Sequence, residues 1–196
     1  MGRSQKEEDE MSDAKLAVVF PGIGYTNDKP LLYYGRKLAA ENGYEVICTE
    51  YHDLPENVKG DHEKMFKAGT MAFEQCIELL KDIDFASYAE VLFIGKSIGT
   101  VMAAKYASMF VPTARLVLYT PLEATFSFGS VRDAIAFIGE ADPWSDLSEV
   151  KRLAAEQGVP LYTYPECNHS LECSNQRKNI QILGEVMELT EQYMKG

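Results

Sequence analysis

A short apolar run breaks directly into a glycine-flanked serine near the middle of the chain. Residues 91–94 are β-branched, aliphatic and aromatic, and residues 95–99, with the sequence GKSIG, follow at once. A helix-forming segment begins immediately afterwards. Glycines two residues before and two after the serine allow a tight turn from strand to helix without steric conflict. The pattern therefore predicts that Ser97 lies on a sharp strand-to-helix turn, with its hydroxyl clear of the sheet.

Further apolar runs of similar length lie on either side of this turn and are bounded by turn-forming residues. They are nearly continuous in apolar character, as expected for strands that are buried on both faces of a sheet. With the run before Ser97, the expected strands are residues 16–20, 44–49, 91–94, 116–119, 134–138 and 161–164.

Segments with helical spacing of apolar residues lie between these runs. Pro30 stands at a first-turn position and Gly43 follows as a stop signal, which marks both ends of one helix. The expected helices are residues 30–42, 63–82, 97–110, 147–157 and 174–195. Alternating strands and helices predict a three-layer, doubly wound α/β fold, with helices on both faces of a mostly parallel sheet of about six strands. In such sheets the reactive groups lie beyond the carboxyl ends of the strands.

The chain length and composition favour a single domain. Its 196 residues suffice to bury a substantial core, and neither an internal repeat nor a Pro/Gly/Ser-rich linker divides it. We expect residues 15–196 to form this domain. Residues 1–14 are polar and mixed in charge, and we expect them to be a disordered arm.

Charge and hydropathy exclude several classes of partner. The formal net charge is −11, and Lys and Arg do not cluster as a phosphate-binding surface would require, so we expect no nucleic-acid partner. No apolar run approaches the roughly 18 residues of a membrane span, and the N-terminal residues lack the apolar core of a signal peptide. We therefore expect no membrane association and a cytoplasmic location.

The four cysteines lack the density and spacing of a disulfide framework. Cys167, His169 and Cys173 superficially resemble a metal cluster, but no C-x-x-C pair accompanies them. We therefore expect free thiols and no metal site.

A serine hydroxyl is a weak nucleophile, so Ser97 would need a neighbouring base and a group that orients this base. Asp142 follows the strand expected at 134–138, and His169 follows the strand expected at 161–164. The chain order Ser, Asp, His is the one found with this kind of strand-to-helix turn. Three residues far apart in the sequence are thus expected to converge on one edge of the sheet as nucleophile, acid and base.

Other residues compete for these roles. Glu140 and Asp146 lie close to Asp142 in sequence and are alternatives for the acid. His52 and His62 precede the serine and are out of order, which makes them weaker candidates for the base. A lone loop Asp or His is usually a surface residue, but three matched positions on three successive loops disfavour that interpretation.

An oxyanion hole requires two backbone N–H groups that point at the developing charge. The amide of Ile98, directly after the serine, is the first candidate. The second would come from the glycine-containing loop after the first strand, where either Ile23 or Gly24 could donate. A plain turn without this role is the alternative for that loop.

Taken together, these motifs resemble the α/β-hydrolase superfamily over residues 15–193. The resemblance implies that Ser97 attacks an acyl carbonyl, His169 moves the proton, Asp142 orients His169, and water releases the acyl group without a cofactor. The chain departs from the superfamily pattern in two respects. It lacks the first two strands of the full fold, and only the short link 120–133 stands where many relatives insert a helical lid.

Without a lid, the rim of a shallow site would come from aromatic side chains. We expect Tyr25, Phe126, Phe128 and Trp144 there, with Lys96 beside the nucleophile, although each aromatic residue could equally be core or surface packing. Such a site suits short acyl esters or thioesters, or an ester on a larger soluble partner.

Two other interpretations compete with this one. The Gly-Lys-Ser sequence echoes a phosphate-binding P-loop, but Glu90 stands where that motif requires glycine. A non-catalytic member of the fold that binds a ligand or partner is the more serious rival. The sequence predicts a Ser-His-Asp hydrolase of a carboxylic ester or thioester, and leaves the physiological substrate and the oligomeric state open.

Overall fold

The core of the protein is a six-stranded, fully parallel sheet. A computed structural model describes residues 13–58, 60–128, 131 and 133–196, so most of the arm expected at residues 1–14 lies outside the described residues. The strand order across the sheet is β2-β1-β3-β4-β5-β6. The strands are β1 (Lys15–Phe20), β2 (Tyr44–Cys48), β3 (Glu90–Lys96), β4 (Arg115–Tyr119), β5 (Ala134–Gly139) and β6 (Leu161–Tyr164).

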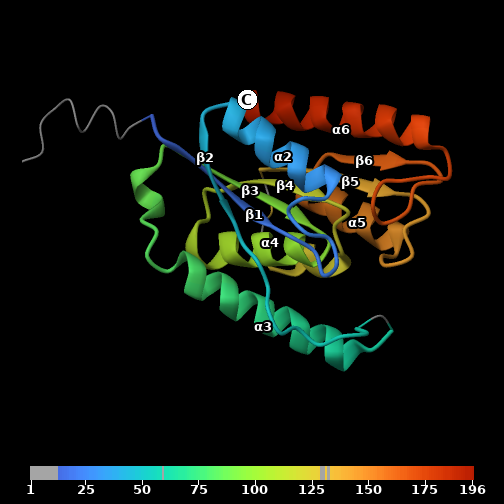
Figure 1. Cartoon of the computed structure of the whole chain (residues 1–196), viewed down its shortest axis with the longest axis horizontal. Coiled ribbons are helices and arrows are strands. Elements are labelled where there is room, and N and C mark those ends of the chain that lie inside the picture. Colours follow the sequence, from blue (N-terminus) through green and yellow to red (C-terminus); the bar gives the residue numbers. More distant parts are fainter. Residues whose placement is uncertain (1–12, 59, 129–130, 132) are drawn as a thin grey trace, which may run out of the picture.

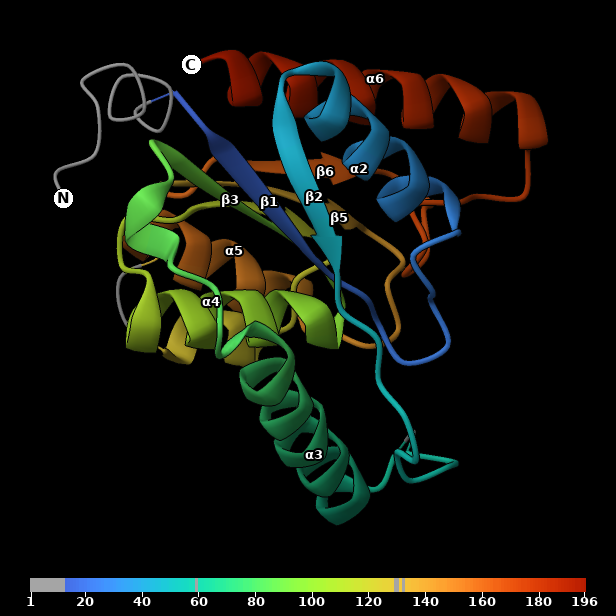
Figure 2. The ribbon, with the colours of Figure 1, turned by 60° about the vertical axis from the view of Figure 1, so that its left-hand side comes forward.

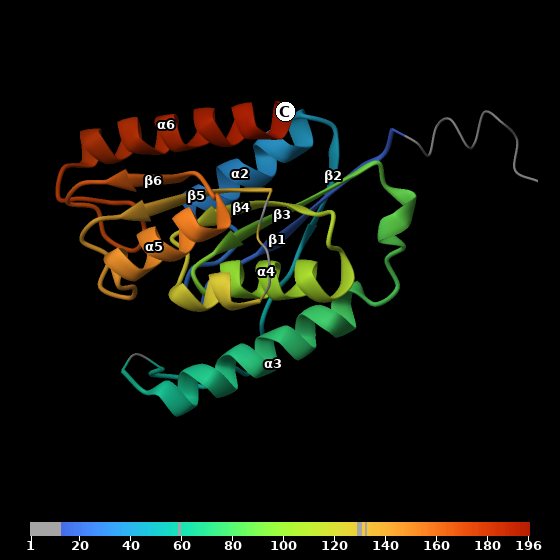
Figure 3. The ribbon, with the colours of Figure 1, turned by 180° about the vertical axis from the view of Figure 1, so that it is seen from behind.

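Helices cover both faces of the sheet, as Figures 1 and 3 show. One face carries α2 (Pro30–Glu41) and α6 (Gln176–Lys195), which also contact each other. The opposite face carries α4 (Ile98–Phe110) and α5 (Leu147–Gln157). Helix α3 (His62–Leu80) lies against α4 on the side away from α2 and α6 (Figure 2). The expected three-layer fold class is confirmed.

The sheet has an apolar core on each side because its strands are buried on both faces. In β3, Val91 and Phe93 pack toward α3 and α4, whereas Leu92 and Ile94 pack toward α2 and α6. Strand side chains alternate between the two faces, so a continuously apolar run fills both cores. The expected strands therefore agree with the observed ones to within two residues.

Local signals explain where the helices begin and end. Pro30 opens α2. Asp146 caps α5 by accepting hydrogen bonds from two amides of its first turn, and Gly158 ends this helix in the left-handed conformation with φ 70°. Asn175 caps α6 in the same way as Asp146 caps α5.

The topology determines where a site can form. All strands are parallel, so the loops after β1, β3, β5 and β6 leave the same edge of the sheet. The chain winds from β1 outward to β2 and then returns to β3, which makes the edge between β1 and β3 the switch point where ligands bind in open α/β sheets. Within the described part of the chain, no helix has the length and apolar character needed to cross a membrane.

Candidate active site

Ser97 occupies the sharp turn between β3 and α4. Its backbone lies at φ 56° and ψ −124°, a conformation that residues other than glycine rarely adopt. Its amide donates to the carbonyl of Tyr119 at 3.0 Å, which ties the turn to β4. Strained backbone of this kind persists only where the surroundings hold it, and it is concentrated at functional sites.

Glycines allow the close packing that holds this turn. A Cβ atom on Gly99 would lie 2.0 Å from the carbonyl oxygen of Phe20, so the first turn of α4 lies directly on the end of β1. A Cβ atom on Gly95 would lie 2.7 Å from the backbone of the same helix turn. A Cβ atom on Gly22 would come within 3.2 Å of Ser97 Cβ, which means that the loop after β1 closely approaches the serine.

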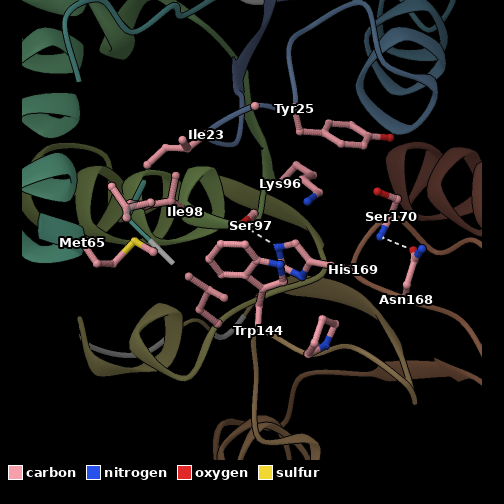
Figure 4. A pocket seen from close by; sticks show the side chains of 14 residues that line it. Ile23, Tyr25, Met65, Lys96, Ser97, Ile98, Trp144, Asn168, His169 and Ser170 are labelled. Atoms are coloured by element: carbon pink, nitrogen blue, oxygen red, sulfur yellow. Dashed lines mark hydrogen bonds between the residues drawn. The ribbon is translucent and has the colours of Figure 1, made fainter. Parts of the chain in front are cut away.

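Two side chains from other loops form a hydrogen-bonded chain with Ser97. His169 Nε2 lies 2.7 Å from Ser97 Oγ, and His169 Nδ1 lies 2.6 Å from Asp142 Oδ2 (the dashed line at Ser97 in Figure 4). The second oxygen of Asp142 accepts a hydrogen bond from the Trp144 amide at 2.9 Å. The Asp142 side chain is 1% exposed and that of His169 is 13% exposed. The structure thus brings together the three residues that the sequence expected at one edge of the sheet.

Backbone contacts between the last two loops hold the partners of Ser97 in place. The amide of Ala141 donates to the carbonyl of Cys167 at 2.9 Å. A Cβ atom on Gly139 would lie 2.2 Å from that same carbonyl oxygen, so glycine permits the contact. The side chain of Asn168 accepts from the Ser170 amide at 2.8 Å and shapes the turn around His169 (Figure 4).

The surroundings of His169 favour the neutral form of its imidazole. Burial lowers the pKa of His169 below its usual value, the hydrogen bond to Asp142 opposes this effect, and the nearby charge of Lys96 adds to it. A carboxylate only accepts hydrogen bonds, so Nδ1 carries the proton of the neutral ring. The Nε2 lone pair is then available to accept the hydroxyl proton of Ser97.

The alternative candidates for the acid and the base, Glu140, Asp146 and His52, make other contacts. Glu140 accepts a hydrogen bond from Thr163 at 2.9 Å, and Asp146 caps α5. His52 lines a separate cavity on the other side of the Ile23–Gly24 turn. Of the candidate acids, the one in hydrogen-bond contact with His169 is Asp142.

The loop after β1 presents backbone amides to the site. Gly22 and Tyr25 exchange two backbone hydrogen bonds at 3.0 and 3.2 Å, which closes a tight turn with Ile23 and Gly24 at its tip. Gly24 has φ 73°, a conformation that favours glycine. Within the described part of the chain, the amides of Ile23, Gly24 and Ile98 have no hydrogen-bond acceptor. The candidate oxyanion donors therefore include all three expected amides.

A cavity of about 330 Å³ opens in front of Ser97 and His169. One of its sides is apolar and the other is polar, and the two reactive side chains lie between them (Figure 4). Ile23, Met65 and Ile98 line the apolar side, and Tyr25, Lys96, Asn168 and Ser170 line the polar side. Val58 and Leu122 also line the cavity.

Lys96 and Tyr25, two of the expected substrate-binding residues, are buried in the polar wall. Lys96 is 3% exposed and its Nζ lies 4.6 Å from the centre of the Tyr25 ring. Burial lowers the pKa of Lys96 to about 7, and the charge of Asp142 opposes this shift. Burial also raises the pKa of Tyr25 to about 12, and its hydroxyl oxygen accepts the Leu31 amide.

The expected aromatic rim is only partly formed. Trp144 lines the cavity with its ring 5.7 Å from that of His169. The prediction for Phe126 is wrong, because this side chain is 4% exposed and packs in the core beside α4. The short 3₁₀ helix η2 (Glu123–Ser127) turns it inward, and Gln157 holds its carbonyl at 2.7 Å. Phe128 lies in a different cavity, so it does not form the rim either.

Sequence reasoning missed one wall of the cavity. Val58 precedes α3 and Met65 lies in its first turn, and both line the cavity in front of Ser97. Leu122, from the link after β4, lines it as well. The only available signal was the apolar character of Val58 in a polar loop, and this does not indicate a direction. Among the described residues, no group of three or more His, Cys, Asp or Glu could hold a metal ion.

Solved structures with a similar architecture are α/β hydrolases and esterases. A serine hydrolase homologue from Coxiella burnetii matches with a TM-score of 0.67 at 17% identity, over 91% of this chain and 84% of that chain. Est1E from Butyrivibrio proteoclasticus, solved with ferulic acid bound, matches with a TM-score of 0.66 at 12% identity, over 94% and 91% of the two chains. A serine hydrolase without a lid from Xanthomonas campestris matches with a TM-score of 0.60 at 17% identity, over 91% and 82%.

No protein-family model and no curated relative matches the sequence. The structural similarity is therefore a similarity of fold. The protein has the α/β-hydrolase fold, built here on six parallel strands, as the resemblance of residues 15–193 predicted.

Proposed function

We propose that this protein is a serine hydrolase that cleaves a carboxylic ester or thioester through an acyl-enzyme. One observation carries the proposal. The continuous hydrogen-bonded chain from Ser97 through His169 to Asp142 starts at a serine on strained backbone and faces a cavity. Nucleophilic catalysis by serine requires this combination of hydroxyl, neutral base and orienting carboxylate.

In the acylation step, Ser97 Oγ attacks the carbonyl carbon of the substrate while His169 Nε2 takes the hydroxyl proton. The resulting imidazolium is stabilised by Asp142 through the Nδ1 hydrogen bond. His169 then gives the proton to the leaving alcohol or thiol as the tetrahedral intermediate collapses. Water attacks the acyl-enzyme by the same route, which releases the acid and restores Ser97.

Backbone amides would stabilise the negative charge that develops on the carbonyl oxygen. Ile98 supplies one N–H group at the start of α4, and the tip of the β1 loop supplies the other from Ile23 or Gly24. These groups lack an acceptor within the described chain, so they are free to bind the oxyanion without first breaking another bond.

The size of the cavity supports a small substrate. A volume of about 330 Å³ is at the lower end of the range for small-molecule sites. An esterase among the structural neighbours supports an ester as the class of substrate. No step of the proposed reaction requires a cofactor.

Turnover of simple esters tests the proposal. We expect the wild-type protein to hydrolyse p-nitrophenyl acetate or an acetyl thioester, and Ser97→Ala to lose at least about 10³-fold in kcat. Ser108→Ala, a substitution at an exposed position of α4, is the matched control and should retain activity. Equal turnover by wild type and Ser97→Ala would contradict the proposal, and no turnover of any ester by the wild type would favour a binding protein.

A further inference from the structure

The polar wall of the cavity holds a buried ammonium group that the proposed reaction does not use. Lys96 is the last residue of β3, and its side chain leaves the sheet on the side of α2. Its stem runs beneath the loop after β1, where a Cβ atom on Gly22 would lie 3.3 Å from Lys96 Cδ. Figure 4 shows Nζ directed into the cavity, beside Ser97 and His169.

Within the described part of the chain, this ammonium group has no counter-ion of its own. Among the described residues, no carboxylate oxygen lies within 4.0 Å of Lys96 Nζ, and no acceptor receives a hydrogen bond from it. Asp142 is the negative group that most affects Lys96, but both of its oxygens already bind other groups. The ring of Tyr25, 4.6 Å away, offers only the weaker attraction of its π face.

Burying a charge without a partner is unfavourable, because the charge loses its hydration and gains no ion pair in return. A ligand that brings a negative group next to Lys96 would relieve this cost. Burial lowers the pKa of Lys96 to about 7, so an anion bound there would also draw a proton onto the amine.

The two sides of the cavity suit two chemically different parts of a substrate. Its apolar side, with Met65 and Ile98, suits a hydrocarbon group. Its polar side, with Lys96 and Ser170, suits a charged one. Ser97 lies between the two sides, so the bond to be cleaved would lie within a few bonds of the negative group (Figure 4).

Resting on the proposed function, we infer that the substrate carries a carboxylate close to its ester or thioester bond, and that Lys96 binds this carboxylate. A single ammonium group matches a singly charged carboxylate. Phosphate sites draw on several donors, and Lys96 is the only Lys or Arg among the described residues that line the cavity. Lys96 is thus a specificity-determining residue next to the nucleophile.

Matched pairs of charged and neutral esters test this inference. On the acyl side, ethyl hydrogen succinate is compared with ethyl succinamate, in which an amide replaces the carboxylate. On the alcohol side, acetoxyacetate is compared with acetoxyacetamide. Near pH 7, we expect wild type to prefer the carboxylate in at least one pair by about tenfold or more in kcat/KM.

Lys96→Met keeps the unbranched stem and removes the charge. This variant should lose the preference to within about twofold while it still turns over the neutral ester. Lys105→Met is the matched control, because Lys105 lies on α4 with its Nζ 3.9 Å from the Phe73 ring, outside the cavity. It should retain the wild-type preference.

The outcomes separate this inference from the proposed function. Wild type that hydrolyses neutral esters and reacts with a fluorophosphonate probe, but shows no charge preference in either pair, would overturn the carboxylate inference alone. Equal losses on charged and neutral esters in Lys96→Met would also overturn it, since they would indicate a structural role. Failure of wild type on all esters and with the probe would instead count against the proposed hydrolase.

A second measurement does not depend on a variant that folds. Succinamate and succinamide are compared as inhibitors of wild-type hydrolysis of ethyl butyrate. We expect the inhibition constant of the carboxylate to be lower by about tenfold or more. Equal inhibition by both compounds would overturn the inference.

Discussion

The Nε2 atom of His169 lies 2.7 Å from the Oγ atom of Ser97, although 72 positions separate the two residues in the sequence. The parallel topology accounts for the contact, because β3 and β6 end at the same edge of the sheet. Asp142, from the loop after β5, completes the chain of hydrogen bonds on the far side of the imidazole.

Asp142→Asn should lower kcat by about 10³- to 10⁴-fold while the fold stays intact. An amide in place of the carboxylate no longer requires a proton on Nδ1, so the imidazole adopts the tautomer whose Nε2 cannot accept the serine proton. Turnover of p-nitrophenyl acetate and circular dichroism would measure the two effects. Asp146→Asn, in which Asn replaces the cap of α5, is the control and should remain active because both residues cap helices well. Turnover in Asp142→Asn equal to that of the wild type would mean that another residue orients His169.

The pH dependence of kcat/KM for a neutral ester should have its acid limb below the usual pKa of histidine, near 6.5. His169 acts as a base only when neutral, and burial and the charge of Lys96 lower its pKa, so activity persists to lower pH and falls as His169 becomes protonated. In Lys96→Met the positive charge is gone, Asp142 remains, and the acid limb should move to higher pH. A limb that stays in place or moves to lower pH would show that Lys96 does not act on His169.

The preference for a carboxylate ester should weaken as the pH rises above about 7. Lys96 carries its charge below its pKa, which burial lowers to about 7, and loses it above. Burial lowers the pKa of His169, and its protonation affects both esters alike, so the neutral partner ester serves as the internal reference. The ratio of kcat/KM values for ethyl hydrogen succinate and ethyl succinamate, followed from about pH 6 to 9, would measure this change. A ratio that is independent of pH would contradict the prediction.

Gly99→Ala should reduce the free energy of unfolding by at least about 1–3 kcal/mol. The added Cβ would lie 2.0 Å from the carbonyl oxygen of Phe20, so α4 would have to move away from β1. Gly184→Ala on α6 is the matched comparison, because a Cβ there meets nothing within 4 Å. It should stabilise the protein by about 0.5–1 kcal/mol, since alanine favours the helix. Urea unfolding measures the free energy of unfolding of both variants. Equal changes in Gly99→Ala and Gly184→Ala would mean that α4 does not pack directly on β1.

Met65→Ala should shift the chain-length preference toward longer esters by enlarging the apolar side of the cavity. One additional buried methylene contributes about 1–3 kcal/mol to discrimination in such a pocket, so room for even one more methylene should raise the kcat/KM ratio of p-nitrophenyl hexanoate to acetate by about tenfold or more. Phe66→Ala is the control on the same helix, because that side chain is 78% exposed. An unchanged profile in Met65→Ala would mean that the substrate does not reach this wall.

Short-range signals in the sequence were sufficient to predict the fold class and the three residues that form the hydrogen-bonded chain, Ser97, His169 and Asp142. Strands buried on both faces produce continuous apolar runs, and proline and glycine mark helix ends, so the element boundaries could be predicted closely. The alternation of strands and helices then predicted a mostly parallel sheet, whereas the order of its strands came from the structure alone. Asp142 and His169 could be named because each directly follows a strand, and parallel strands bring such positions together.

The walls of the cavity could not be predicted in the same way. Phe126 was expected at the rim, but a 3₁₀ helix turns it into the core, and the sequence of that helix carries no periodicity. Met65 falls within the helix expected at residues 63–82, but nothing in the sequence indicates that the start of α3 lies at the cavity in front of Ser97. Side-chain direction in irregular segments depends on tertiary contacts, which no local pattern in the sequence encodes.

The most direct test of whether His169 activates Ser97 as a nucleophile is reaction with a fluorophosphonate probe. Mass spectrometry of the intact protein and its peptides then locates the label. Serine activated by His169 displaces fluoride from the probe and retains the phosphonyl group. We expect one phosphonyl group per wild-type chain, attached at Ser97, and none on Ser97→Ala. Wild-type protein that stays unlabelled while a known esterase reacts fully, or that is labelled at another residue, would contradict it.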